Sequence, residues 1–301
     1  MTFTDWIDES RERVRTSGWS GVKRSVYEFY VGMWRNVGKR YNYGTPIWEE
    51  DWDICIVLDA CRWDLMNEVE ADYDFVDDNA KYSVASSSGE WIPKTFDGVD
   101  TSEVAYVTAN PFSKMLLDDE DFLVLDEVWD YAVDEAIRTI PADAVTDRGI
   151  TAYRKHNPDK LILHYMQPHY PFVPNPMDDG LPLHDFGQNP WDDVWDKLHA
   201  SEVDRDEVWR NYRANLEYVL DSVNTLLDNI DGEVLITADH GNLLGEWGLY
   251  GHPDKVPIKA LKRVPWCKTQ ATDTGTYEPE DWSETDAAQD REELLRDLGY
   301  R

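Results

Sequence analysis

Short apolar runs alternate along this chain with stretches in which apolar residues recur every three or four positions. The runs have the length of buried strands and cover residues 53–58, 81–85, 104–108, 122–125, 161–166 and 234–236. The helical patterns cover residues 62–70, 141–156 and 205–230, and a short one covers 291–298. Strands that alternate with helices predict an α/β fold with an open, mostly parallel sheet and helices on both faces.

The first 50 residues differ from the rest of the chain in charge. Between Arg11 and Arg40 there are eight basic residues and only two acidic ones. Between them lie apolar residues at helical spacing, namely Trp19, Val22, Val26, Tyr30 and Trp34. This pattern predicts a basic amphipathic helix. One interpretation is peripheral contact with a membrane surface or a partner through residues 11–40. The preferred interpretation is a helix that packs its aromatic face on the main domain while its basic face meets acidic neighbours.

The remaining boundaries follow from composition. Residues 51–268 carry the alternating pattern and are predicted to form the catalytic domain. Within it, residues 171–200 are rich in Pro, Asp, Gly and Trp and have the character of an insertion or active-site lid. Residues 269–301 are an acidic, turn-rich tail with a short helix. We find neither a signal peptide nor a run of about 18 apolar residues, so we expect a cytoplasmic protein, with any membrane contact at the inner face.

Acidic residues dominate the composition. The chain has 61 Asp and Glu against 29 Lys and Arg, a formal net charge of -32, which disfavours nucleic acid as a partner. Such acidity is typical of salt-loving cytoplasms, where it keeps proteins hydrated, and suggests a salt-loving archaeon. The chain has three cysteines, Cys55, Cys61 and Cys267, and none of them forms a CxxC motif. This argues against a disulfide framework and favours a reducing compartment.

Candidate chemistry concentrates where predicted strands end. The run at 234–236 leads into Asp239, His240 and Gly241, which offer a carboxylate and an imidazole, ligands that suit zinc or manganese. His252 follows after a glycine-rich turn, and Asp59 ends the strand that begins at residue 53. Ser88 and His169 also lie in loops that follow predicted strands. Because ligands bind beyond the carboxyl ends of parallel strands, all of these residues are expected at one edge of the sheet.

Three segments together resemble the alkaline phosphatase superfamily, particularly its sulfatase-like and lipid phosphotransferase branches. They are Val57-Leu-Asp-Ala-Cys-Arg-Trp-Asp64, His164-Tyr-Met-Gln-Pro-His-Tyr-Pro-Phe172, and Thr237-Ala-Asp-His-Gly-Asn-Leu-Leu-Gly-Glu-Trp-Gly-Leu-Tyr-Gly-His252. Their order and spacing match as well, over residues 50–265. The resemblance implies the α/β fold of that superfamily and a metal-dependent reaction on a phosphate or sulfate ester.

Carried over to this sequence, the resemblance implies that Asp59, Asp239 and His240 hold a divalent metal ion, with the nucleophile as a further ligand. It implies that His169 contacts the transferred group, and that His252 does the same or helps to bind a second ion. A cation would also compensate two aspartates that otherwise repel each other. Arg62 follows Asp59 and is a candidate for bidentate contact with the anion, or for an ion pair with Asp64.

The nucleophile is where the sequence departs from the sulfatases. Their Cys-x-Pro-x-Arg motif is absent, and Cys61 lies in a different segment. Other branches use a hydroxyl at the amino end of a helix, where free backbone N–H groups favour an oxyanion. Ser88 fits that place best, with Ser86 and Ser87 as alternatives and a plain helix cap as the simpler role. A second Asp-x-x-x-His pair is missing, so we expect one tightly bound metal ion.

The sequence thus predicts a metal-dependent hydrolase or transferase that acts on a phosphate ester, or less plausibly a sulfate ester, through a metal-activated serine. Zinc or manganese is the expected cofactor, with calcium or magnesium as other candidates. The substrate would be an ester that a glycan or a lipid can carry. The alternative is a degenerate protein of the same fold that binds an anionic glycan or lipid headgroup without catalysis.

Overall fold

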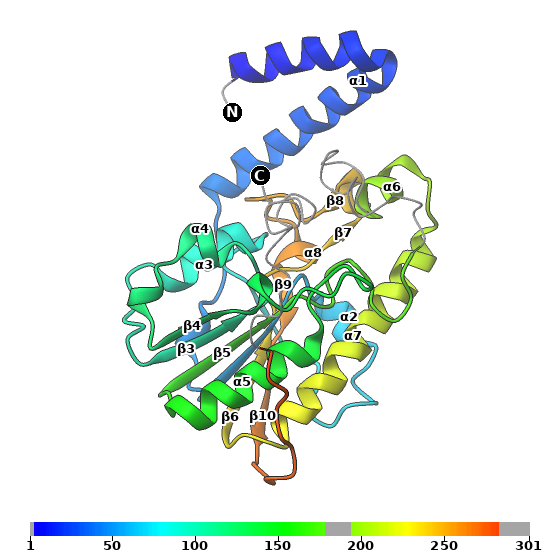
Figure 1. Cartoon of the computed structure of the whole chain (residues 1–301). Helices are drawn as coiled ribbons and strands as arrows, with labels where there is room; N and C mark the ends of the chain where they lie inside the picture. The colour runs from blue at the N-terminus through cyan, green and yellow to red at the C-terminus, as the bar shows by residue number, and fades with distance from the viewer. Residues whose placement is uncertain (1–2, 178–193, 283–301) are drawn as a thin grey trace.

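The fold is built on a twisted six-stranded sheet. The computed structural model describes residues 3–177 and 194–282 (Figure 1). The strands lie side by side in the order β10 (Cys267–Ala271), β6 (Gly232–Thr237), β1 (Ile54–Leu58), β5 (Lys160–Tyr165), β3 (Val104–Thr108) and β4 (Val124–Glu127). Neighbouring strands are parallel, except that the edge strand β10 runs antiparallel to β6. The predicted α/β fold with an open, mostly parallel sheet is confirmed.

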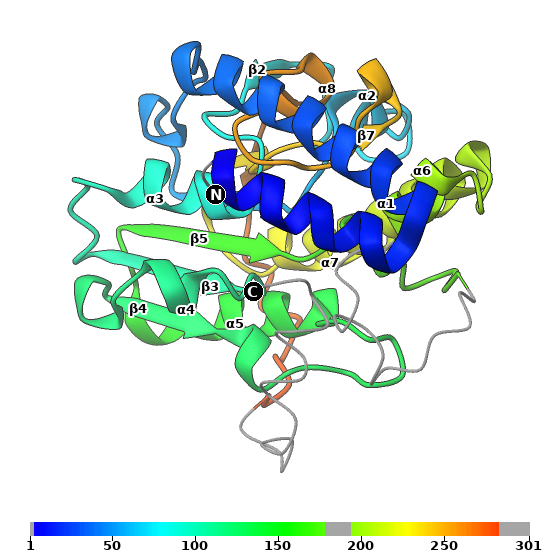
Figure 2. The same cartoon turned by 90° about the horizontal axis from the view of Figure 1, so that it is seen from above.

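Side chains of the central strand β1 alternate between two cores. Ile54, Ile56 and Leu58 face one hydrophobic cluster, and Cys55 and Val57 face another. The first cluster is covered by α5 (Ala142–His156) and α7 (Arg205–Leu227), and the second by α3 (Ser88–Phe96). Helices therefore cover both faces, as Figures 1 and 2 show, and β1 is an uninterrupted apolar run because both of its faces are buried.

Shorter elements surround this framework. Two small antiparallel sheets pair β2 (Ala80–Tyr82) with β9 (Arg263–Pro265), and β7 (Leu243–Leu244) with β8 (Tyr250–Gly251). The other short α-helices are α2 (Trp63–Asn67), α4 (Ser113–Leu116), α6 (Val194–Ala200) and α8 (Lys259–Lys262). The 3-10 turns are η1 (Ile47–Glu49), η2 (Asp119–Asp121), η3 (Val128–Asp130) and η5 (Glu246–Gly248).

The N-terminal helix α1 (Phe3–Arg40) bends sharply at Gly18, where φ is 56°. Its second half packs on the loops around β7, β8 and α8 through Tyr27, Tyr30, Val31 and Trp34. The hydroxyl of Tyr30 donates to the carbonyl oxygen of Trp247 at 3.0 Å. In the part of the chain that the structure describes, no helix is both long and apolar enough to cross a membrane.

Several predicted boundaries shift in the structure. β10 extends to Ala271, past the boundary drawn at residue 268, and the following segment continues to pack on α5. There the Tyr277 hydroxyl and the Trp282 indole both donate to the Asp147 carboxylate, at 2.7 and 2.8 Å. Of the predicted insertion at 171–200, residues 178–193 lie outside the described residues, and so does the short helix predicted at 291–298.

Candidate metal centre

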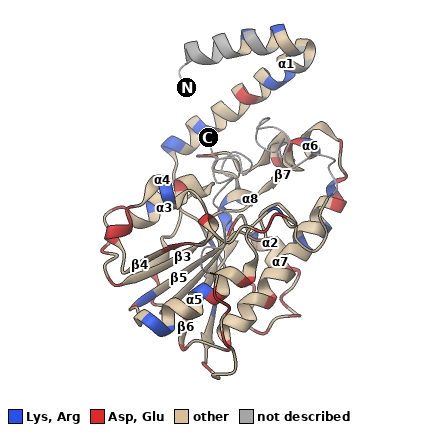
Figure 3. Cartoon of the chain, in the orientation of Figure 1, with Lys and Arg blue, Asp and Glu red and all other residues tan. Residues whose placement is uncertain are grey.

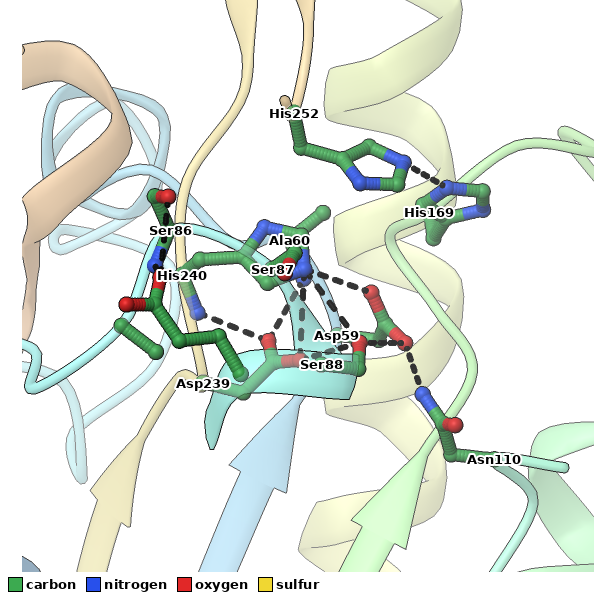
Figure 4. A network of polar contacts seen from close by, with 12 residues as sticks. Asp59, Ala60, Ser86, Ser87, Ser88, Asn110, His169, Asp239, His240 and His252 are labelled. Atoms are coloured by element: carbon green, nitrogen blue, oxygen red, sulfur yellow. Dashed lines mark hydrogen bonds and ion pairs between the residues drawn. The ribbon is translucent and has the colours of Figure 1, made fainter. Parts of the chain in front are cut away.

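Two neighbouring parallel strands bring two aspartates together. Asp59 directly follows β1, and Asp239 comes two residues after the end of β6, with Val57 of β1 opposite Thr237 of β6. His240 follows Asp239, and all three side chains are buried. One ligand atom from each lies within 4.8 Å of the others, as a metal site requires (Figure 4). This group could hold a metal ion through two carboxylates and one imidazole, a donor set that suits zinc or manganese.

Ser88 brings a hydroxyl into the same group. It is the first residue of α3, and its Oγ lies 2.6 Å from Asp239 Oδ2, 3.3 Å from Asp59 Oδ2 and 3.3 Å from His240 Nε2. The hydroxyl therefore bonds to the aspartates and does not cap the helix, whose N-cap residue is Ser87. At the start of a helix, backbone N–H groups lack intrahelical acceptors and attract negative charge.

The two serines before Ser88 point elsewhere. The Ser86 hydroxyl contacts Glu90 at 3.2 Å and the carbonyl oxygen of Pro253 at 3.0 Å. The Ser87 hydroxyl donates to Asp254. Neither makes a hydrogen bond to the Asp59, Asp239 and His240 group among the described contacts, so the geometry favours Ser88 over both alternatives.

The Asp239 carboxylate is well supplied with donors. Its Oδ1 accepts from the backbone N–H groups of Ala60 and His240, at 3.0 and 2.8 Å, and its Oδ2 accepts from Ser88. Burial alone would raise the pKa of Asp239, but the nearby His240 and His164 side chains and the Ser88 hydroxyl hold it well below its usual range. Asp239 is therefore an anion in the folded protein.

The Asp59 carboxylate has fewer hydrogen-bond donors than that of Asp239. Its Oδ2 accepts from the Asn110 side-chain amide at 2.8 Å, whereas its Oδ1 is buried and has no hydrogen-bond partner among the described residues. Burial, and next to it the charge of Asp239, raise the pKa of Asp59 to about 7. A buried carboxylate oxygen without a donor, beside a second carboxylate, is typical of a metal ligand, because a cation compensates both groups. The residues present therefore fit a divalent metal ion.

Two further histidines lie over this group. His169 Nε2 and His252 Nε2 are 3.0 Å apart, and the His252 ring stacks on the ring of His240 at 4.8 Å between centroids. Burial, followed by the neighbouring His240 and His169, lowers the pKa of His252 well below its usual range. The pair is partly exposed and lies to one side of the metal-ligand group, next to His240, as Figure 4 shows. The structure thus brings His169 and His252 next to the centre but outside the group of ligands.

Groups of the protein itself surround the Arg62 guanidinium. Its guanidinium forms ion pairs of 2.6 Å with both Asp64 and Glu246, and it donates to the carbonyl oxygen of Asn242 at 2.9 Å. The guanidinium also lies 5.1 Å from the centre of the Trp209 ring. These contacts correspond to the ion-pair interpretation of Arg62, because they occupy the guanidinium with protein partners.

Two residues that support the centre went unnoticed in the sequence. Asn110 lies two residues after β3 and orients Asp59; its position after a buried strand could have identified it. Ala60 adopts φ 59°, a conformation that few residues other than glycine adopt, and this turn aims its N–H at Asp239. His164, inside β5, pairs with the Tyr106 hydroxyl at 2.8 Å and lies 3.7 Å from Asp239 Oδ2.

Comparison with known proteins gives similarity in fold only. No family model matches the chain, and no curated protein sequence matches it. The periplasmic domain of phosphoethanolamine transferase EptC from Campylobacter jejuni is similar over 72% of this chain and 78% of that one, with 16% identity and a TM-score of 0.45. The integral membrane protein EptA from Neisseria meningitidis is similar over 95% of this chain and 63% of its own, with 14% identity and a TM-score of 0.47.

A third similar structure contains a metal ion. It is the periplasmic domain of EptC from Escherichia coli in complex with Zn, which aligns over 80% of this chain and 79% of that one. Its identity is 12% and its TM-score 0.36.

Proposed function

We propose that this protein is a metal-dependent phosphotransferase or hydrolase that acts on a phosphate ester through Ser88. One observation carries the proposal: the Ser88 hydroxyl lies among Asp59, Asp239 and His240, while a buried oxygen of Asp59 lacks any donor among the described residues. A hydroxyl that bonds only to acidic groups and an imidazole is placed to be a ligand and a nucleophile at once.

In this proposal Asp59, Asp239, His240 and Ser88 hold one divalent ion, with zinc or manganese preferred. The bound ion would lower the pKa of the serine hydroxyl and neutralise negative charge on the transferred phosphoryl group. Asn110 keeps Asp59 in place, and the N–H of Ala60 does the same for Asp239. These supporting contacts matter because a misplaced ligand weakens a metal site by one to two orders of magnitude, roughly 10–100-fold.

Ser88 Oγ gives up its proton and attacks phosphorus in line with the leaving oxygen. The bond from phosphorus to that oxygen breaks, and the leaving group takes up a proton and departs as an alcohol. The product is a phosphoserine, which passes its phosphoryl group to water or to an acceptor hydroxyl. His169 and His252 steady the non-bridging oxygens. The His169 and His252 Nε2 atoms lie 3.0 Å apart, so one non-bridging oxygen can lie close to both rings.

The test is a panel of aryl phosphate monoesters, phosphate diesters and sulfate esters, assayed in high salt with chelator and then with zinc, manganese, magnesium or calcium. We expect turnover of one phosphate ester class that chelation abolishes and metal restores. Asp239→Ala should abolish it as well, because it removes a ligand. Asp147→Asn is a matched control: Asp147 is a buried aspartate on α5 whose partners are Tyr277 and Trp282, outside the site.

Turnover that survives both the chelator and Asp239→Ala would contradict the proposal. Stoichiometric metal binding without turnover of any ester and without modification of Ser88 would support the alternative predicted from the sequence, a protein that binds an anionic glycan or lipid headgroup. A lipid- or glycan-linked phosphate ester is the substrate class that we propose to add to the panel.

A further inference from the structure

The second half of α1 has two apolar faces. One face carries Tyr27, Val31 and Trp34, which pack on the body of the protein with Leu243, Leu249, Val256, Ile258 and Leu261. At Gly38 the helix approaches so closely that an added Cβ would lie 1.8 Å from the carbonyl oxygen of Lys255. This half of the helix is therefore fixed to the body. The exposure of its other face does not come from detachment of the helix.

That other face exposes large apolar side chains. Trp19 is 73% exposed, Val26 62%, Met33 53% and Val37 42%. Their spacing of seven, seven and four residues places them on one side of the helix. Exposed apolar residues scattered singly are ordinary, but a stripe along one helix signals a surface that something else covers.

Basic side chains occupy other exposed positions of this half of the helix, and two of them, Lys23 and Arg40, border the stripe at three residues from Val26 and Val37. Lys23, Arg35, Lys39 and Arg40 are exposed and make no ion pair among the described residues. In a chain with a net charge of -32, this concentration of free cations on one helix is unusual (Figure 3). The preferred interpretation of the sequence, in which the basic face meets acidic neighbours, does not describe these four residues.

We propose that this face of α1 docks on an anionic lipid bilayer. Helices that lie in the membrane interface combine an apolar face, which enters the acyl boundary, with flanking Lys and Arg that meet the headgroups. A second copy of the chain fits less well. Two copies that met through the same stripe would bring Lys23 and Arg40 of both copies together, and like-charge repulsion opposes that arrangement.

The docking surface lies on the same side as the candidate metal centre. The body residues under α1 belong to the segment between His240 and His252 and to the loop and helix α8 that follow it. Figures 1 and 2 show α1 above β7 and α8, beyond the carboxyl ends of the strands. A bilayer bound by α1 would therefore face the histidine pair, which favours a lipid-linked phosphate ester as substrate; this last step rests on the proposed function.

The experiment measures co-sedimentation of the full chain with phosphatidylcholine vesicles, with and without phosphatidylglycerol. We expect binding only to the anionic vesicles, weakened by added salt because screening reduces the attraction. Val26→Ser combined with Met33→Ser should lower the bound fraction, and Leu123→Ser is the matched control because Leu123 is exposed at the opposite end of the sheet. Lys23→Gln combined with Arg40→Gln should lower the partition coefficient at least about tenfold, against no change for Lys155→Gln, because Lys155 is exposed in the last turn of α5.

Three outcomes would overturn the inference. The first is the absence of binding to either kind of vesicle. The second is binding that the α1 variants leave unchanged. The third is a dimer in light scattering that Val26→Ser with Met33→Ser dissociates, because a second copy would then cover the stripe. Asp239→Ala should bind vesicles like the original chain, so failure of the docking surface and failure of the proposed chemistry can be told apart.

Discussion

Asp59→Asn should stabilise the metal-free protein near pH 8, although it removes a residue from the proposed site. Burial and the Asp239 charge raise the pKa of Asp59 from 3.8 to about 7 on folding. As the pH rises from about 4 to about 7, this carboxyl ionises in the unfolded chain before it does in the folded one. Ionisation therefore lowers the free energy of the unfolded state more than that of the folded state, and the metal-free protein loses stability over that range. Asparagine keeps an oxygen for Asn110 and removes the charge.

The magnitude follows from the rise in the pKa of Asp59 and can be compared with the repulsion between the two aspartates, which is one cause of that rise. One pKa unit corresponds to about 1.4 kcal/mol, so a rise from 3.8 to about 7 costs about 4 kcal/mol at pH 8. Two unit charges within 4.8 Å repel by at least about 3.5 kcal/mol at an effective dielectric constant of about 20. A free energy of this size is large enough to measure in a protein whose total stability is on the order of 10 kcal/mol.

Urea unfolding with chelator at pH 5 and pH 8 is the assay. The free energy of unfolding of the Asp59→Asn variant should exceed that of the original chain, and the difference should be larger at pH 8 than at pH 5. Added zinc should make the original chain the more stable of the two, because only the original chain binds the ion tightly. Asp147→Asn is the control: Asp147 is buried but accepts two hydrogen bonds, so its replacement should lower stability with or without zinc. An Asp59→Asn variant less stable than the original chain at pH 8 without metal would refute the reasoning.

Three other substitutions test separate contacts. Arg62→Ala should lower the free energy of unfolding by about 2 kcal/mol, because it leaves two carboxylates without their partner. Urea unfolding measures this change. A variant that is as stable as the original chain and is altered only in substrate binding would contradict the structural role. His252→Ala should reduce kcat about 100-fold and leave bound zinc unchanged by metal analysis; loss of the ion would make His252 a ligand. Gly38→Ala should push α1 away from Lys255 and speed its proteolysis, whereas Gly32→Ala, with open space around it, should not.

Much of the fold could be predicted because the physical signals are local. β1, β3, β5 and β6 are apolar runs buried on both faces, and α5 and α7 repeat their apolar residues at helical spacing. β10 was missed because it is an edge strand with exposed polar residues, and its sequence, Cys-Lys-Thr-Gln-Ala, has no apolar run. Its place depends on pairing with β6, a contact that no local pattern encodes.

The candidate site was predictable to a similar extent. Parallel strands bring the residues at their carboxyl ends to one edge of the sheet, which is why Asp59 and Asp239 could be placed together. The choice of Ser88 over its two neighbours depends on where the first turn of α3 points, and the role of Asn110 depends on the distance between β3 and β1. The two faces of α1 needed the structure as well, since spacing alone does not say which face is covered.

The central claim is that Ser88 is a nucleophile held in a metal centre. Its most direct test is peptide mass mapping after the zinc-loaded protein has reacted with an aryl phosphate monoester and been quenched in acid. The account predicts one phosphoryl group on Ser88, present with zinc and absent with chelator, in Ser88→Ala and in Asp239→Ala. Turnover without phosphorylated Ser88, or a phosphoryl group on Ser86 or Ser87 in its place, would contradict it.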